Sequence, residues 1–269
     1  MIIANIEEAL NREQWWVKPG VDLYKAFPDL YEREGHRAGY TKPTHAMKGA
    51  LILLWLEWHQ GIRYEQIMKK MKFIIERGIQ VNKDPMVYQL LREDHDNFMI
   101  QLSILTGIKR LMIDVCESVI EADPNSQGYQ YLQAWTGILK YRILGNQDKV
   151  LEQYEIMQRF KSTRIFLWPL DKLVGSFVDR DYKTFNSVLK RSCERQWKWS
   201  EKEKAISRNS NGELVLDAPG RHEHFMWPWV EGAFAKLAFM DGADIKYDSL
   251  WLPLDLVKAV EQGEACGIS

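Results

Sequence analysis

The strongest constraint on the fold is a pair of tight turns in the middle of the chain. They lie at Gly145 and Asp179, 34 positions apart, and apolar residues recur every three or four positions on both sides of each turn. The flanking segments are 127–144, 150–160, 165–178 and 182–197. Helical hairpins of the tetratricopeptide type repeat at about this period and stack, because one hairpin alone cannot bury its apolar face. The full tetratricopeptide pattern is missing, so the sequence predicts irregular stacked hairpins, with a chance spacing as the alternative.

Helical spacing also recurs nearer the N-terminus. The segments that show it are 45–59, 64–77 and 97–120. We expect Gly61 and Gly78 to end the first two helices. The acidic run Glu93-Asp94-His95-Asp96 is expected to cap the third, where negative charge meets the positive end of the helix dipole. A further short helix is expected over 5–16.

A polar stretch over 200–220 interrupts the helical pattern and predicts a long loop. The Leu214-Val215-Leu216 patch within it is too short to predict a strand. The sequence therefore predicts an all-α fold of irregular stacked helical hairpins in one compact domain over 1–269. A division into 1–123 and 124–269 is left open.

Composition excludes several classes of protein. The 36 basic and 37 acidic residues nearly balance, so there is no electrostatic footprint for nucleic-acid binding. Cys116, Cys193 and Cys266 fit neither a disulfide framework nor a paired-cysteine zinc site. The most apolar run, Gly49 to Leu56, is far shorter than the ~20 residues needed to span a bilayer, and the N-terminus does not resemble a signal peptide. We expect a cytoplasmic protein that does not bind membranes.

The polar clusters do not predict catalysis. His222 and His224 could share a metal only on an extended segment, because on a helix they would point apart; a polar loop is the simpler interpretation. Glu57 and His59 do not face each other on a helix. His95 lies in the acidic run that is expected to cap the helix over 97–120. Phosphate-loop, dinucleotide and nucleophile-elbow motifs are missing. We predict no catalytic, cofactor-binding or metal-binding residues and no enzymatic activity.

Two Trp-x-Trp pairs bracket the polar stretch, Trp197-Lys198-Trp199 before it and Trp227-Pro228-Trp229 after it. On an extended segment alternate residues share a face, so the two pairs could stack together. Burial in the core is one interpretation. The other is an aromatic anchor for a partner protein with charges at its rim. The predicted partner-binding residues are Trp197, Lys198, Trp199, Glu201, Glu203, His222 and His224.

The stretch after this loop predicts a closing helical hairpin: an aromatic entry, an apolar helix, a turn at Asp241-Gly242, a short extended piece and a second helix near Pro253. Glu231 stands among apolar residues and needs hydrogen-bond partners if buried; Arg221 or the amides of the preceding loop are the candidates. The residues predicted to be structural are Trp227, Trp229, Glu231, Asp248, Trp251 and Pro253.

Residues 100–260 resemble the immunity protein 49 family of bacterial polymorphic-toxin systems. The features that carry the resemblance are the Trp-rich entry at Trp227, Glu231 with the helix from Gly232 to Ala238, Gly242, the tail Asp248-Ser249-Leu250-Trp251-Leu252-Pro253 and the Asp179–Phe185 turn. The immunity family paired with PoNe-type nuclease toxins shares a Trp-x-x-Glu-Ala helix and an Asp-Ser segment, but here Gly232 stands in place of that Ala.

Both resemblances imply the same role: a cytoplasmic, non-enzymatic protein that binds and neutralises a cognate toxin. Neither carries catalytic or toxin-contacting residues to this chain, and the choice between monomer and dimer stays open. A helical-repeat scaffold that binds an unrelated peptide or protein is the alternative.

Overall fold

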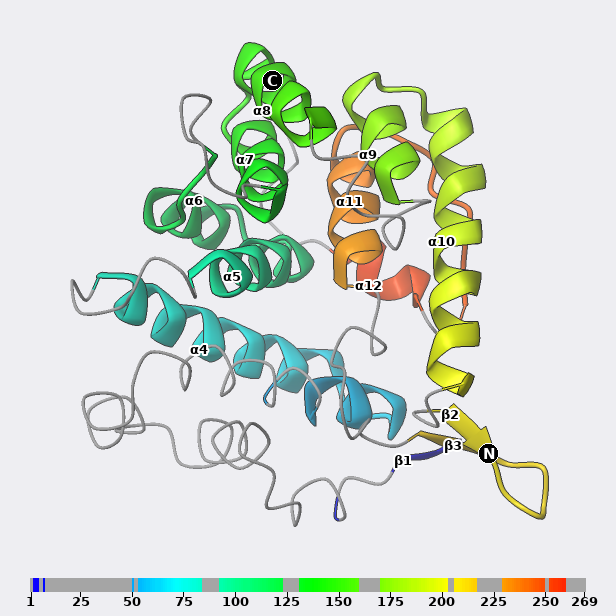
Figure 1. The fold of residues 1–269 in the computed structure, drawn as a ribbon. Helices are drawn as coiled ribbons and strands as arrows, with labels where there is room; N and C mark the ends of the chain where they lie inside the picture. The colour runs from blue at the N-terminus through cyan, green and yellow to red at the C-terminus, as the bar shows by residue number, and fades with distance from the viewer. Residues whose placement is uncertain are drawn as a thin grey trace. The chain divides into compact units, whose positions relative to one another are not determined.

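The computed structural model describes residues 2–4, 7, 50, 53–83, 92–122, 131–159, 170–202, 206–216, 229–249 and 252–259. These residues are mostly helical, which confirms the predicted all-α class (Figure 1). Residues 53–59 are helical, and the helices that follow are α4 (Tyr64–Lys83), α5 (Arg92–Thr106), α6 (Lys109–Ser118), α7 (Tyr131–Ile143), α8 (Gln147–Arg159), α9 (Leu170–Val178), α10 (Tyr182–Lys202), α11 (Trp229–Met240) and α12 (Leu254–Lys258). The strands are β1 (Ile2–Ala4), β2 (Ile206–Arg208) and β3 (Leu214–Leu216).

The chain divides into two compact units, each discontinuous in sequence. The first comprises 1–95 and 195–227, and the second comprises 96–194 and 228–269. Because the units interleave along the chain, a cut near residue 123 does not separate them. The predicted helix over 5–16 lies outside the described residues, apart from a helical residue 7.

A small sheet in the first unit corrects the predicted loop over 200–220. Strand β3 is central, pairing in parallel with β1 and antiparallel with β2. Asn209 Oδ1 accepts backbone N–H groups of Asn211 and Glu213 in the turn between β2 and β3, at 3.0 and 2.9 Å. Leu214 and Leu216 are buried. The patch forms a strand because residues 2–4 supply a partner, a long-range contact that local sequence patterns do not reveal.

Three predicted helix boundaries are wrong. Helix α4 continues through the buried Gly78 to Lys83, because a glycine in a helix costs only about 1 kcal/mol and the neighbouring Ile74 and Ile75 are in the core. The single helix predicted over 97–120 is interrupted at Gly107, whose φ of +69° favours glycine. Helix α5 begins at Arg92, so the acidic run lies inside its first turns rather than before it.

The two predicted hairpin turns are confirmed in the second unit. Gly145, with φ +71°, separates α7 from α8, and Arg180, with φ +57°, lies between α9 and α10. Asp181 Oδ1 accepts the backbone N–H of Thr184 at 3.1 Å, which caps the start of α10. Helix α8 also contacts α9, and α9 contacts α11. Stacking of successive helices is thus present in the middle of the chain.

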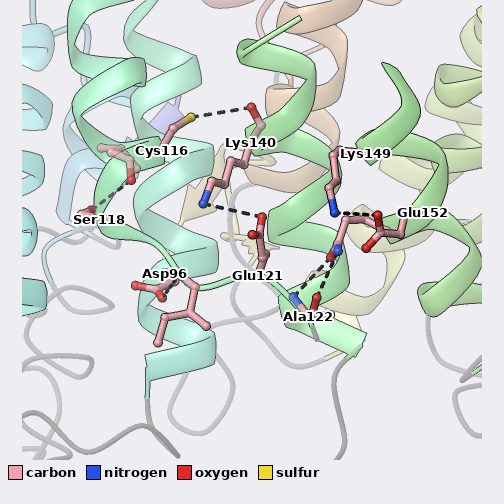
Figure 2. A network of polar contacts seen from close by, with 11 residues as sticks. Asp96, Cys116, Ser118, Glu121, Ala122, Lys140, Lys149 and Glu152 are labelled. Atoms are coloured by element: carbon pink, nitrogen blue, oxygen red, sulfur yellow. Dashed lines mark hydrogen bonds and ion pairs between the residues drawn. The ribbon is translucent and has the colours of Figure 1, made fainter. Parts of the chain in front are cut away.

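Side chains of this unit hold residues 119–122, which follow α6, by several contacts (Figure 2). Asp96 Oδ2 accepts the N–H of Ile120 at 2.9 Å. Gln153 binds both backbone groups of Ala122, at 3.2 and 3.1 Å. A Cβ on Gly137 would come within 2.4 Å of Gln153 Oε1. Glycine at position 137 therefore lets α7 approach α8 while Gln153 keeps these bonds.

Helix α11 forms the core of the second unit. The Phe234 ring packs 5.0 Å from that of Phe177 in α9 and 6.1 Å from that of Trp135 in α7, measured between ring centroids. Nearly every residue of α11 is buried, including Trp229 and Glu231. As predicted, a turn at 241–242 follows this helix and α12 comes after it; residues 243–249 have no regular secondary structure.

Asp248 and Pro253, both predicted to be structural, lie at the start of α12. Pro253 is the N-cap residue of α12, and Asp248 Oδ1 accepts the N–H of Leu254 at 3.0 Å. The predicted structural residues Trp227 and Trp251 lie outside the described residues.

A buried ammonium group ties α11 to the ends of two other helices. Lys236 is fully buried, and its Nζ donates to the carbonyl oxygens of Leu105 and Leu256, both at 3.0 Å, and of Ala259. These carbonyls belong to the C-terminal ends of α5 and α12, where acceptors lack helical partners and the dipole is negative. A Cβ on Gly107 would lie 3.0 Å from Lys236 Cε, so that glycine makes room for the lysine side chain.

A second buried charge lies where the helix ends of this unit meet. Arg142, near the end of α7, binds Asp241, which follows α11; the two side chains are 5% and 9% exposed. Arg142 Nη1 also donates to Gln147 Oε1 at 2.8 Å, and the Tyr182 hydroxyl donates to Asp241 Oδ2 at 3.1 Å. The Arg142 guanidinium lies 5.4 Å from the centroid of the Phe177 ring. This cluster joins α7, α8, α10 and α11.

Candidate partner-binding surface

The last turns of α10 carry four of the seven residues predicted to bind a partner. Trp197, Lys198, Trp199 and Glu201 all lie on this helix. Lys198 and Glu201 are exposed, whereas the two indole rings are partly exposed. The other three predicted residues, Glu203, His222 and His224, lie outside the described residues.

The structure changes how the two tryptophans are arranged. Residues two apart on a helix point about 200° apart, so Trp197 and Trp199 do not share a face. The expectation that they alternate on an extended segment is wrong, because α10 continues to Lys202. Trp229 is buried in α11, and Trp227 lies outside the described residues.

Each indole ring is held by a side chain one turn away. Trp197 Nε1 donates to Glu201 Oε1 at 2.9 Å. The guanidinium of Arg195 lies 4.8 Å from the centroid of the Trp199 ring, within cation–π range. These contacts hold each ring in place on its own side of α10. Ordered, partly exposed tryptophans beside charged groups are typical of binding hot spots.

Sequence patterns missed two members of this surface, Arg195 and Lys202. Both are spaced three or four positions from Lys198 and lie on the same side of α10. The signal was present in the sequence, but it becomes visible only when the helix is extended past Trp197. We call Arg195, Trp197, Lys198, Trp199, Glu201 and Lys202 the α10 surface.

Glu231 is a fully buried carboxyl group. Its Oε1 accepts the hydroxyl of Ser192 in α10 at 2.5 Å, and its Oε2 has no hydrogen-bond partner among the described residues. The partner that the structure shows is thus Ser192, while Arg221 lies outside the described residues. Burial raises the pKa of Glu231, an effect that the Ser192 hydrogen bond opposes. Burial and the charge of Glu231 raise the pKa of Cys193, which keeps this thiol protonated and unreactive.

We expect Glu231 to make stability fall as pH rises. Its pKa in the folded protein is raised above its ordinary value of 4.5, so its contribution is fully present below that value. As pH increases through the raised pKa, the unfolded chain has already released its proton and the folded state must ionise a buried group. Between pH 4.5 and 8, the free energy of unfolding of Glu231→Gln should therefore fall less than that of the wild type, as measured by urea unfolding. Glu231→Ala should be destabilised by about 1–3 kcal/mol, because it loses the Ser192 bond and leaves a cavity.

The control for this experiment is Glu194→Gln, at an exposed position of α10. His59 acts in the opposite direction, because burial lowers its pKa to about 4 and its neutral form then stabilises the protein at higher pH. Each variant is therefore compared with the wild type at both pH values. An unchanged pH dependence in Glu231→Gln would contradict the prediction.

The other polar residues of the sequence clusters make structural contacts. Glu57 binds Lys70 Nζ at 2.6 Å, and the His59 ring packs edge-on against Trp55 at 5.0 Å between centroids. Burial raises the pKa of Cys116 to about 12; its thiol faces the carbonyl of Lys140 (Figure 2). Within the described ranges, no cluster of three or more His, Cys, Asp and Glu is placed to hold a metal ion.

None of the helices that the structure describes is both long enough and apolar enough to cross a membrane. Comparisons of the chain with protein-family models, with curated proteins and with solved structures find no match.

Proposed function

We propose that this protein is an immunity protein, which binds an antibacterial toxin in the cytoplasm and neutralises it without catalysis. The observation that carries the proposal is the α10 surface, where two partly exposed tryptophans are held in place beside exposed charges. The resemblance of residues 100–260 to toxin-immunity families supports the same role.

The physical basis of such binding would be desolvation of the Trp199 ring, which lies on the side of α10 that carries Arg195 and Lys202. A tryptophan in the centre of an interface contributes about 2 kcal/mol or more, because a large apolar area leaves water while its N–H keeps a partner. Here Glu201 already satisfies the N–H of Trp197, and Arg195 lies over Trp199. Binding at Trp197 would therefore not leave its N–H unpaired, and binding at Trp199 would cover a ring that already contacts a cation.

The test is protection by co-expression. The protein encoded by the neighbouring upstream gene is produced in a sensitive bacterial host, with and without this chain, and complex formation is measured by calorimetry. We expect growth to be restored and a complex to form. If the upstream protein is toxic but this chain neither protects nor binds, the proposal fails. Binding to a non-toxic neighbour would instead favour the helical-repeat scaffold.

Single substitutions locate the binding surface. Trp199→Ala is expected to weaken the complex by roughly 30-fold, equivalent to about 2 kcal/mol. The matched control is Trp58→Ala, because Trp58 is also partly exposed and also contacts an aromatic ring, that of Tyr64 at 6.4 Å. Both variants should lose similar stability, but only Trp199→Ala should lose affinity. Equal affinity losses would show that the binding site lies elsewhere.

A further inference from the structure

We propose that the α10 surface binds an acidic protein surface, with Arg195, Lys198 and Lys202 as the contacting cations. This inference rests on the proposed function and adds the chemistry of the partner. It follows from two observations. Three basic side chains lie along one side of a helix, and the described carboxylates do not form ion pairs with them.

The three cations form a short row. Steps of three and four residues place Arg195, Lys198 and Lys202 on one side of α10. With a rise of about 1.5 Å per residue, the row is roughly 10 Å long. Lys198 and Lys202 are exposed, and Trp199 lies beside the row, in contact with Arg195. An acidic partner could pair with the cations while the ring is covered by apolar groups.

Carboxylates within the described ranges do not form ion pairs with this row. Among the described residues, no ion pair joins any of the three cations to an acidic side chain, whereas other lysines of the helices have such partners: Lys70 with Glu57, Lys149 with Glu152 and Lys190 with Glu194. Two acidic residues of α10 adjoin the row in sequence: Glu194 pairs with Lys190, and Glu201 accepts a hydrogen bond from Trp197. The chain as a whole carries a net charge of −1, so the row is a local concentration of positive charge.

A protein fits this row better than a nucleic acid does. Nucleic-acid binding relies on many phosphate contacts and usually on a strongly basic domain, whereas this row has three cations on a chain with balanced charge. Complementary charges at a protein interface act mainly by accelerating encounter and selecting the partner. If the row binds no partner, the role of Lys202 would be to stabilise the negative C-terminal end of α10.

The experiment uses the full chain and two labelled probes, a 20-residue poly-L-glutamate peptide and a single-stranded DNA oligomer of equal length, with binding measured by fluorescence anisotropy. The variant is Lys198→Glu/Lys202→Glu. Its control is Lys69→Glu/Lys72→Glu on α4, which makes the same charge change at exposed positions. We expect the peptide to bind the wild type and the control equally, to bind the variant at least tenfold more weakly, and to dissociate as salt is added.

Several results would overturn the inference. They are an equal loss of peptide binding in the control, DNA binding tighter than peptide binding, and a variant that is less stable but binds the peptide normally. The protection assay separates this inference from the proposed function. If the row binds the acidic peptide but the chain does not protect against the toxin, the proposed function fails and the acidic-partner site remains. If the chain protects and the variant protects equally well, the acidic-partner site fails.

Discussion

Lys236→Met is expected to lower the free energy of unfolding by about 3 kcal/mol, because buried carbonyls that lose their donor each cost about 1–3 kcal/mol. The substitution keeps most of the side-chain volume and removes the ammonium group that binds Leu105, Leu256 and Ala259. Loss of the buried charge itself offsets part of this cost. The effect should be concentrated at the C-terminal ends of α5 and α12.

Two measurements check this prediction. Urea unfolding gives the total loss of stability. Amide hydrogen exchange should be accelerated by the substitution, relative to the wild type, more in α12 than in α8. The control is Lys258→Met, the same change at an exposed position of α12, which should leave both measurements unchanged. A Lys236→Met protein with wild-type stability would mean that the ammonium does not hold these helix ends together.

Asp241→Ala is expected to be the most damaging change of a charged residue, with a loss of about 3–5 kcal/mol, because it leaves the charge of Arg142 buried without a counter-ion. The same substitution removes the acceptor of the Tyr182 hydroxyl. Asp241→Asn should be less damaging, since its amide oxygen can still accept hydrogen bonds from Arg142 and Tyr182. Thermal unfolding of the three proteins should give the order wild type, Asn variant, Ala variant.

The matched control is Asp244→Ala, three residues further along the same segment. Asp244 also faces a cation, Lys246 at 3.5 Å, but the two side chains are 75% and 73% exposed. Water and salt screen such a pair, so its removal should not change stability measurably. Similar melting temperatures for Asp241→Ala and Asp244→Ala would show that the Arg142 pair contributes no more than a surface contact.

The α10 surface illustrates how much of a candidate site a sequence can predict. Trp197, Lys198, Trp199 and Glu201 could be selected because aromatic and charged residues alternate beside a break in the helical pattern. Their orientation could not, since it depends on whether the backbone is extended or helical at residues 197–202. The helix separates the two rings and brings Arg195 next to Trp199.

Local patterns determined the parts of this protein that depend on neighbouring residues. Helical spacing of apolar residues and the turns at Gly145 and Asp179 were enough to place α7–α8 and α9–α10, because a helix and its turn are set by residues within a few positions of one another. The same local signals gave the course of the closing segment from α11 to α12.

Only the tertiary structure decided the features that depend on residues far apart. Strand β3 forms because residues 2–4 pair with it, and Gly107 ends α5 where the side chain of Lys236 needs space. In the sequence, Lys236 is a single lysine in an apolar helix and Asp241 is a turn residue. Their importance comes from the acceptors and donors that folding brings to them, and burial makes each of those contacts costly to lose.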